Sequence, residues 1–211
     1  MSAQSFEVMR NRMVADQLAG RGIRDPRVLE VMRKVPRHLF VPPEQQRESY
    51  DDRPLPIGYG QTISQPYIVA LMLERLHVCP GLKVLEVGTG SGYQVGLLAE
   101  LGAVVYSIER IPELAETAAR NLKAAGIQGV RIRVGDGSRG WPEEALFDRV
   151  IAAACAPELP EILLDQLAEG GRLVIPVGEG LNQKLMVVQR SEDGIQTQEV
   201  CGCLFVPLVT V

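Results

Sequence analysis

Short apolar runs alternate with amphipathic stretches through the second half of this chain, and the alternation constrains its fold more than any other feature. Five runs have the composition of buried strands: residues 84–87, 103–108, 130–134, 149–153 and 173–177. Apolar positions at helical spacing lie between several of them, at about 91–101, 112–125 and 158–168. Strand–helix–strand units connect with a right-handed crossover and form parallel sheets with helices on both faces. The pattern predicts an α/β fold, a doubly wound, Rossmann-like sheet that is mostly parallel.

Two further runs after the alternation predict an antiparallel edge. The strand-like residues 184–189 and 200–206 are joined by the turn sequence SEDG at 191–194, which favours a hairpin. A length of 211 residues suits a single domain. We expect that domain to consist of an N-terminal helical and loop cap over 1–78 and an α/β core over 79–211.

The N-terminal part lacks the strand–helix alternation of the core. Apolar residues at helical spacing over 6–20 and 26–34 predict two helices, the second of which starts at the pair Asp25-Pro26. Residues 36–66 contain six prolines, too many for long regular elements, and predict a loop-rich cap. A third helix is expected to begin near Pro66, where proline is tolerated in a first turn.

Composition and charge narrow the classes of function. The 22 Lys and Arg residues against 26 Asp and Glu give a net charge of −4, and aromatic residues make up 5% of the chain. Nucleic-acid binders usually present a basic face and stacking rings, so we expect no nucleic-acid partner. No apolar run approaches the ~18 residues that span a bilayer, and the first residues lack the pattern of a secretory signal. We therefore expect a cytoplasmic protein without a membrane partner.

The four cysteines and two histidines show no metal-ligand spacing. Cys79, Cys155, Cys201 and Cys203 form no C-x-x-C pair, and the last two would lie on the same side of a strand. Small, buried, reduced thiols are the expected state. The sequence predicts neither a metal site nor a disulfide framework.

The most informative motif is VLEVGTGSGYQ at 84–94, in which a buried strand runs through glycines into a helix. In an open α/β sheet such a turn lies at the carboxyl ends of the strands, where ligands bind. Gly88, Gly90 and Gly92 let the backbone approach a ligand closely, and amides at the helix start can hold an anionic group. A tight strand-to-helix turn without a ligand is the alternative.

The glycine spacing selects among ligands. A nicotinamide or flavin fingerprint needs G-x-G-x-x-G, whereas this loop reads G-x-G-x-G and its third glycine comes one residue early. A Walker loop needs Lys and then Ser or Thr after its last glycine, and here Tyr93 follows instead. Phosphate-binding chemistry is therefore disfavoured.

Two acidic residues stand at the ends of the next two strands. Glu109 comes 21 residues after Gly88, where a carboxylate can accept hydrogen bonds from ribose hydroxyls. Asp136, in the sequence GDG at 135–137, could receive an adenine amino group while the neighbouring backbone contacts the ring. Either acid could instead act locally, Glu109 at a helix start and Asp136 as a cap or turn residue. The three strand ends together fit an adenosine without pyrophosphate, as in S-adenosyl-L-methionine.

With these residues in place, the chain resembles the class I S-adenosylmethionine-dependent methyltransferases, and among them the protein-L-isoaspartate (D-aspartate) O-methyltransferase family. The resemblance covers nearly the whole chain. Its motifs are VPRHLFVP at 35–42, LPIGYGQTISQP at 55–66, VLEVGTGSGYQ at 84–94, AAACAP at 152–157, GGRLVIPVG at 170–178 and FVPL at 205–208. Many methyltransferases share the glycine loop, whereas GQTISQP at 60–66 is much more specific.

The resemblance implies a fold, a reaction and a set of site residues. The fold is the class I methyltransferase sheet, and the reaction moves a methyl group from S-adenosyl-L-methionine to the free α-carboxylate of L-isoaspartyl residues in damaged proteins and peptides. S-adenosyl-L-homocysteine is the implied product, Ser64 the implied active-site residue, and a monomer the expected state. The implied cofactor-binding residues are Gln61, Thr62, Ile63, Ser64, Glu86, Gly88, Thr89, Gly90, Ser91, Gly92, Glu109, Asp136 and Gly137.

The implied reaction needs few catalytic groups. A backbone-type carboxylate has a pKa of about 3.3–3.7 and is ionised at pH 7, so no general base is required. Aligning its oxygen with the methyl carbon and the sulfonium can contribute roughly 7–11 kcal/mol. Ser64 would position the acceptor by hydrogen bonding, or cap the helix that starts near Pro66, or do both. The methyl ester is a good leaving group, so it closes to a succinimide whose hydrolysis returns some normal aspartate.

Three other interpretations stay open from the sequence. A class I methyltransferase acting on a small molecule would share the glycine loop but not GQTISQP. A nucleic-acid base methyltransferase would carry an Asp/Asn-Pro-Pro-aromatic motif where this chain has CAPE at 155–158. A non-catalytic binding module would keep the loop without needing Ser64.

Overall fold

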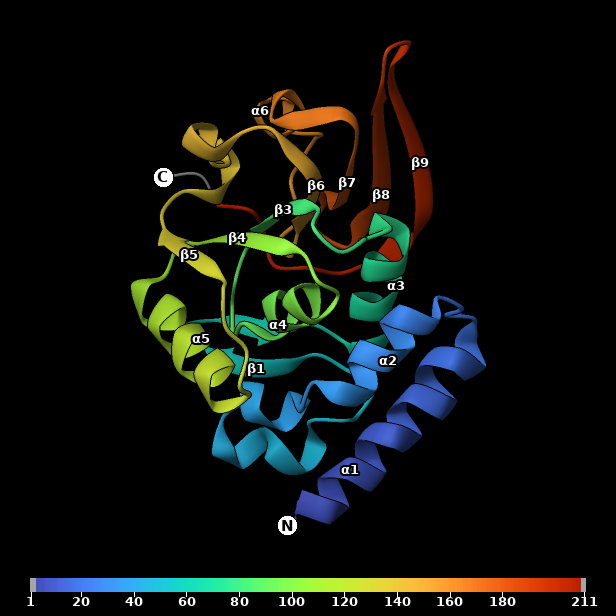
Figure 1. Ribbon diagram of the computed structural model, residues 1–211, viewed down its shortest axis with the longest axis vertical. Helices are drawn as coiled ribbons and strands as arrows, with labels where there is room; N and C mark the ends of the chain where they lie inside the picture. Colours follow the sequence, from blue (N-terminus) through green and yellow to red (C-terminus); the bar gives the residue numbers. More distant parts are fainter. Residues whose placement is uncertain (1–2, 210–211) are drawn as a thin grey trace.

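The architecture is a seven-stranded sheet covered on both faces (Figure 1). The computed structural model describes residues 3–209. The strands of the sheet are β3 (Lys83–Val87), β4 (Val104–Glu109), β5 (Arg131–Val134), β6 (Phe147–Ala152), β7 (Leu167–Glu179), β8 (Asn182–Ser191) and β9 (Gly194–Cys203), in the order β5-β4-β3-β6-β7-β8-β9. β3 to β7 pair in parallel, whereas β8 pairs antiparallel with both β7 and β9. The predicted parallel sheet with an antiparallel edge hairpin is confirmed.

Side chains of successive strand residues point to opposite faces of the sheet, and both faces are covered by helices. Val84 of β3 belongs to one buried cluster with Leu98 of α4 (Tyr93–Glu100) and Leu114 of α5 (Pro112–Ala124). The next residue, Leu85, belongs to a second cluster with Leu163 of α6 (Glu161–Asp165). Figure 1 shows α4 and α5 below the sheet and α6 above it. The doubly wound arrangement is therefore confirmed.

The N-terminal segment folds as a cap of helices and short turns. Its helical elements are α1 (Ala3–Arg12), η1 (Met13–Leu18), η2 (Ala19–Arg21), α2 (Pro26–Lys34), η3 (Arg37–Phe40), η4 (Pro43–Glu48) and α3 (Pro66–Leu76). The carboxylate of Asp25 accepts a hydrogen bond from the backbone N–H of Arg27, which confirms the helix start predicted there. Buried residues of the cap lie in the same cluster as those of α4 and α5, so cap and sheet share a continuous core.

The proline-rich segment contains a small hairpin where the sequence predicts only loop. Its strands β1 (Leu55–Gly58) and β2 (Gln61–Ile63) pair antiparallel, with Leu55 opposite Ile63 and both side chains buried. Gly58 and Gly60 have positive φ, as the tight turn between the strands requires. Pro56 is tolerated because its side chain is exposed in a two-stranded sheet that has free edges.

Several other boundaries differ from the prediction, among them the start of β7, which is Leu167 rather than residue 173. The helix expected over 158–168 is limited to Glu161–Asp165, because Pro160 stands at its N-cap and β7 already begins at Leu167. The last strand is Gly194–Cys203 rather than 200–206. Its first six residues are exposed, so they lack the apolar alternation that marks a half-buried strand. Figure 1 shows this end of the β8–β9 hairpin extending beyond the body of the sheet.

The thiols differ in burial: Cys155 is buried and Cys201 and Cys203 are half-buried, whereas Cys79 is exposed, so the expectation of a buried thiol is wrong there. All four cysteines are free, and Cys201 and Cys203 of β9 pack against the same buried cluster, which confirms that they share a face. Within residues 3–209, no helix has the length and apolar character needed to cross a bilayer.

Replacing Gly92 by alanine should cost more stability than replacing another glycine of similar backbone conformation. Gly92 has φ +86°, and a Cβ there would lie 3.1 Å from Cβ of Ala118 in α5. Gly126 has φ +74°, but a Cβ there would meet no heavy atom within 4 Å. We expect Gly126→Ala to lose about 1 kcal/mol through backbone strain, and Gly92→Ala roughly 2–4 kcal/mol because overpacking is added. Urea unfolding measures both, and equal losses would contradict the packing role of Gly92.

Candidate functional site

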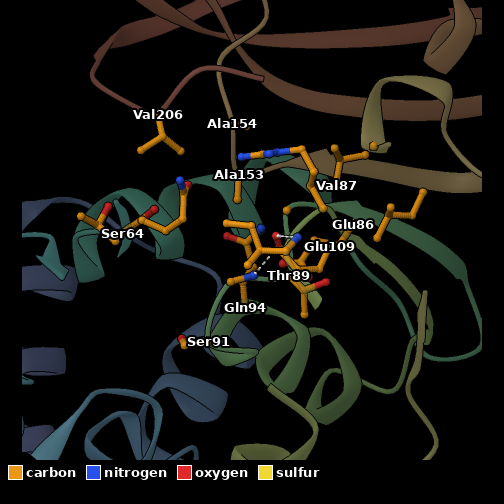
Figure 2. Close-up of a pocket in the computed structure, with 18 of the residues that line it drawn as sticks. Ser64, Glu86, Val87, Thr89, Ser91, Gln94, Glu109, Ala153, Ala154 and Val206 are labelled. Carbon is orange, nitrogen blue, oxygen red and sulfur yellow. Dashed lines mark hydrogen bonds between the residues drawn. The ribbon is translucent and has the colours of Figure 1, made fainter. Parts of the chain in front are cut away.

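A pocket opens at the carboxyl ends of β3, β4 and β6, where the glycine loop turns into α4 (Figure 2). The space between its walls, counted together with its open mouth, is about 950 Å³. Eleven of the residues implied by the resemblance line it: Gln61, Thr62, Ile63, Ser64, Glu86, Gly88, Thr89, Gly90, Ser91, Glu109 and Gly137. The cap and the core therefore supply opposite parts of one cavity. In the view of Figure 2, Ser64 lies on one side and Glu109 toward the other, with Thr89 between them.

The glycine loop takes a conformation that L side chains rarely adopt. Gly88, Gly90 and Gly92 have φ values of +93°, +54° and +86°. The backbone N–H of Gly88 donates to the carbonyl of Ile108 at 2.9 Å, which fixes the start of the loop against β4. The loop thus reverses direction within a few residues and leaves its backbone at the pocket wall.

Glu109 joins the glycine loop to the start of α5. Its Oε2 accepts a hydrogen bond from the backbone N–H of Gly90 at 2.8 Å, and its Oε1 accepts one from the N–H of Ile111 at 3.0 Å. The side chain is 6% exposed. Glu109 supports the helix start, and it also lines the pocket, where each carboxylate oxygen has a further lone pair to offer.

Glu86 is a fully buried acid in the wall of the pocket. Its Oε2 accepts a hydrogen bond from the Ser107 hydroxyl at 2.8 Å, and that hydroxyl lies 2.6 Å from Oγ1 of Thr89. Within residues 3–209, neither Oε1 of Glu86 nor Nε2 of Gln94 makes a hydrogen bond of normal length, although the Gln94 side chain lies near enough to favour the ionised form of Glu86. Burial raises the pKa of Glu86 to about 8, against the opposing effect of the Ser107 hydrogen bond. A polar ligand would satisfy both unpaired atoms.

Two implied residues do not line the pocket. Gly92 instead packs against Ala118, as described above. Asp136 accepts hydrogen bonds from the backbone N–H of Ser138 at 2.9 Å and from its hydroxyl at 2.6 Å, so it caps the short helix η5 (Gly137–Arg139). Its neighbour Gly137 does line the pocket, and a Cβ there would lie 2.5 Å from Val87. The turn that Asp136 holds therefore brings backbone, rather than this carboxylate, to the cavity.

Ser64 lies in the extended link between β2 and α3, and it does not cap the helix. The N-cap position belongs to Gln65, without a side-chain capping bond. Within residues 3–209 the Ser64 hydroxyl makes no hydrogen bond, whereas its carbonyl oxygen accepts one from Nη2 of Arg37 at 2.8 Å. The hydroxyl stays available at the pocket wall.

Part of the pocket wall comes from residues outside the implied cofactor-binding set, in the strand end at 152–157, predicted as a wall of the peptide site, and in the FVPL motif at 205–208. Ala153 and Ala154 line the pocket at the end of β6, and the N–H of Ala153 donates to the carbonyl of Val87 at 2.8 Å. Residues 206–209 also line it, because the N–H of Cys155 donates to the carbonyl of Val206 at 2.8 Å. No spacing rule relates residues 206–209 to a loop more than a hundred positions earlier.

Comparison with known proteins identifies relatives over the full length of the chain. The model of the family described as Protein-L-isoaspartate(D-aspartate) O-methyltransferase matches residues 9–211. The protein-L-isoaspartate O-methyltransferase of Methanoculleus marisnigri is 52% identical to this chain, over 99% of this chain and 95% of its own length. Protein-L-isoaspartate O-methyltransferase 1 of Syntrophobacter fumaroxidans is 53% identical, over 97% of this chain and 96% of its own length. The crystal structure of the Plasmodium falciparum counterpart, in complex with S-adenosyl-L-homocysteine, aligns with a TM-score of 0.84 and 32% identity, covering 95% of this chain and 98% of that one.

The stability of the ligand-free protein should depend on pH through Glu86. Its pKa rises from an ordinary 4.5 to about 8 on folding, so its contribution to stability is fully present below the unfolded value and is lost as the pH rises through the folded one. The loss amounts to at most about 1.4 kcal/mol per pH unit between these values. Glu86→Gln, which keeps the shape without titrating, should flatten the dependence of the free energy of unfolding measured by urea denaturation.

The control for this experiment is Glu116→Gln, since Glu116 is 75% exposed on α5. It should leave the slope of the wild-type curve unchanged. If Glu86→Gln gave a curve parallel to that of the wild type across the whole window, the raised pKa of Glu86 would be wrong.

Proposed function

Because this chain belongs to the protein-L-isoaspartate(D-aspartate) O-methyltransferase family, we propose that its pocket holds S-adenosyl-L-methionine beside the free α-carboxylate of an L-isoaspartyl residue. The enzyme transfers a methyl group to that carboxylate in damaged proteins and peptides, and the methyl ester reverts through a succinimide. The observation that carries the placement is that residues 61–64 of the cap and the glycine loop of the core line one pocket. The cap segment would then face the acceptor and the loop the methyl donor.

The residues present suit the methyl donor. Glu86 and Gln94 each offer a buried polar atom that lacks a partner within residues 3–209, and they would hold its charged amino-acid end. Glu109 would accept hydrogen bonds from the ribose hydroxyls. Gly137, which brings backbone to the cavity wall, would contact the adenine, with Asp136 holding the turn that presents it. The bound donor supplies an electrophilic methyl group on a sulfonium.

The protein has to align and enclose the acceptor rather than activate it. The α-carboxylate is ionised at pH 7, so no side chain must remove a proton. In our proposal the Ser64 hydroxyl donates a hydrogen bond to this carboxylate and orients one oxygen toward the methyl carbon. Ala153 and Val206 would form the apolar wall that excludes water from the reacting atoms. Orientation of this kind can contribute roughly 7–11 kcal/mol, enough for a site without general acid–base groups.

We also propose the setting in which the enzyme works. Residues 1–211 would act as a single domain in which the cap 1–78 closes the site carried by 79–211, in keeping with the core that both parts share. A cytoplasmic location agrees with four unbridged cysteines, and one chain supplies every residue of the proposed pocket, so a monomer suffices. Cell fractionation and the mass in solution would test these two points.

A pair of peptides tests the function itself. The enzyme should methylate a peptide with L-isoaspartate and leave the same peptide with L-aspartate unmodified, because the normal side-chain carboxylate hangs from a differently routed backbone. A misplacement of about 1 Å can cost on the order of 10²-fold in rate. Transfer of labelled methyl, recovered as base-labile ester and followed by succinimide, measures both rates. Comparable rates on the two peptides would overturn the repair function.

Ser64→Ala should slow methyl transfer and leave donor binding nearly intact. Losing a hydrogen bond to a charged acceptor should lower kcat roughly 10- to 100-fold, while the Kd for S-adenosyl-L-methionine changes by less than about tenfold. Ser191→Ala is the matched control, since this serine lies in the distant β8–β9 turn and its hydroxyl donates to the carbonyl of Gly194. Full turnover in Ser64→Ala would remove Ser64 from the reaction.

A further inference from the structure

Arg37 is a fully buried cation that lies between the cap and the core. It stands at the start of η3, and its side chain is the largest of those with almost no exposed surface. Burial lowers the pKa of Arg37 to about 10, so the guanidinium stays charged at neutral pH. A charge is rarely enclosed in this way without a specific set of partners, since its desolvation is costly.

The partners of Arg37 come from three separate parts of the fold. Nε donates to the carbonyl of Ser49 at 2.7 Å, and Nη2 donates to the carbonyl of Ser64 at 2.8 Å. The guanidinium also lies 4.9 Å above the ring centre of Tyr93, the first residue of α4. One rigid side chain therefore connects the cap, the link before α3 and the helix that follows the glycine loop.

Acidic neighbours do not account for this burial. Asp52, the acid that acts electrostatically on Arg37, is itself paired with Arg21 and bonded to the side chain of Gln65 at 2.9 Å. Within residues 3–209, Nη1 of Arg37 has no hydrogen-bond partner. The defined contacts of the guanidinium are thus two backbone carbonyls and one aromatic ring.

The bond to Ser64 matters because it restrains the Ser64 carbonyl, whereas the next residue, Gln65, is held separately: its carbonyl accepts from the N–H of Val69, and its side chain donates to Asp52. Ser64 and Gln65 lie outside both β2 and α3, so neither a strand ladder nor the helix fixes the Ser64 carbonyl. Arg37 is the donor that this carbonyl has within residues 3–209. The direction of the Ser64 side chain follows from the backbone dihedrals that the bond restrains, and the hydroxyl itself has no anchor of its own.

We propose that Arg37 is a positioning residue for methyl transfer, which holds the Ser64 hydroxyl toward the acceptor carboxylate by fixing the Ser64 carbonyl from inside the protein. The inference rests on the proposed contact between Ser64 and the acceptor. The planar fork of arginine reaches Ser49 and Ser64 together, which the single ammonium of lysine cannot reproduce. The contact with the Tyr93 ring fixes the position of the guanidinium relative to α4.

The test is a double-mutant cycle between Arg37→Lys and Ser64→Ala, assayed with the L-isoaspartyl peptide at saturating S-adenosyl-L-methionine. Arg37→Lys alone should lower kcat at least about tenfold and change the donor Kd less than about threefold. In the Ser64→Ala background the same change should lower kcat less than about threefold, because the hydroxyl that it misplaces is already absent. The inference would be overturned if Arg37→Lys lowered kcat by the same factor in the wild-type and Ser64→Ala backgrounds. It would also be overturned if Arg37→Lys alone kept the full wild-type kcat.

Matched variants separate positioning from loss of folding. His38→Ala removes a neighbour in η3 that stacks on Phe6 and bonds to the Tyr50 hydroxyl without touching Ser64, so it should destabilise the cap while keeping kcat. Arg37→Gln provides a second, neutral replacement, and bound donor stabilises each variant by mass action during the assay. A drop in kcat for His38→Ala as large as that for Arg37→Lys would contradict positioning. Full activity of Ser64→Ala would instead contradict the proposed role of Ser64, so the two failures are distinguishable.

Discussion

The carboxylate of Glu109 is the interaction on which the pocket depends most directly, because it joins the two turns that form its base. β3 and β4 pair with Val87 level with Ile108, so the end of β4 stands beside the glycine loop. From there Glu109 accepts hydrogen bonds from Gly90 and Ile111. Without it, the half-buried backbone N–H of Gly90 would lose the partner that fixes the loop. The parallel register of β3 and β4 thus determines where Glu109 meets the glycine loop, and so determines the shape of that loop.

Two buried ionisable groups contribute to the proposed reaction site, Glu86 in the pocket wall and Arg37 behind Ser64. Burial raises the pKa of Glu86 to about 8 and lowers that of Arg37 to about 10, so each is pushed toward its neutral form. Each also has one polar atom without a partner within residues 3–209. Apolar residues of similar volume would often serve stability as well or better. Glu86 lines the pocket, where its unpaired oxygen can meet a polar group from outside the chain, whereas Arg37 acts on the pocket through Ser64.

Much of this arrangement follows from local sequence patterns. The periods of apolar residues identify the core strands and α5, and the glycine spacing with Glu109 identifies the pocket edge. What the patterns miss depends on pairing between distant segments. The β1–β2 hairpin forms because Leu55 and Ile63 are buried together, and Val206 reaches the pocket through a bond to Cys155. Asp136 is ambiguous in the sequence because an acid before glycine can cap a turn or face a ligand, and only packing decides.

The contact between Gly92 and Ala118 links the ligand loop to a residue of α5 that does not line the pocket. Ala118 is fully buried, and the space beside it is filled by the backbone of the loop. A larger side chain at 118 would push the loop away from the base of the pocket. The ligand loop therefore limits which side chains can occur at position 118. A substitution at either position, 92 or 118, would need a matching change at the other.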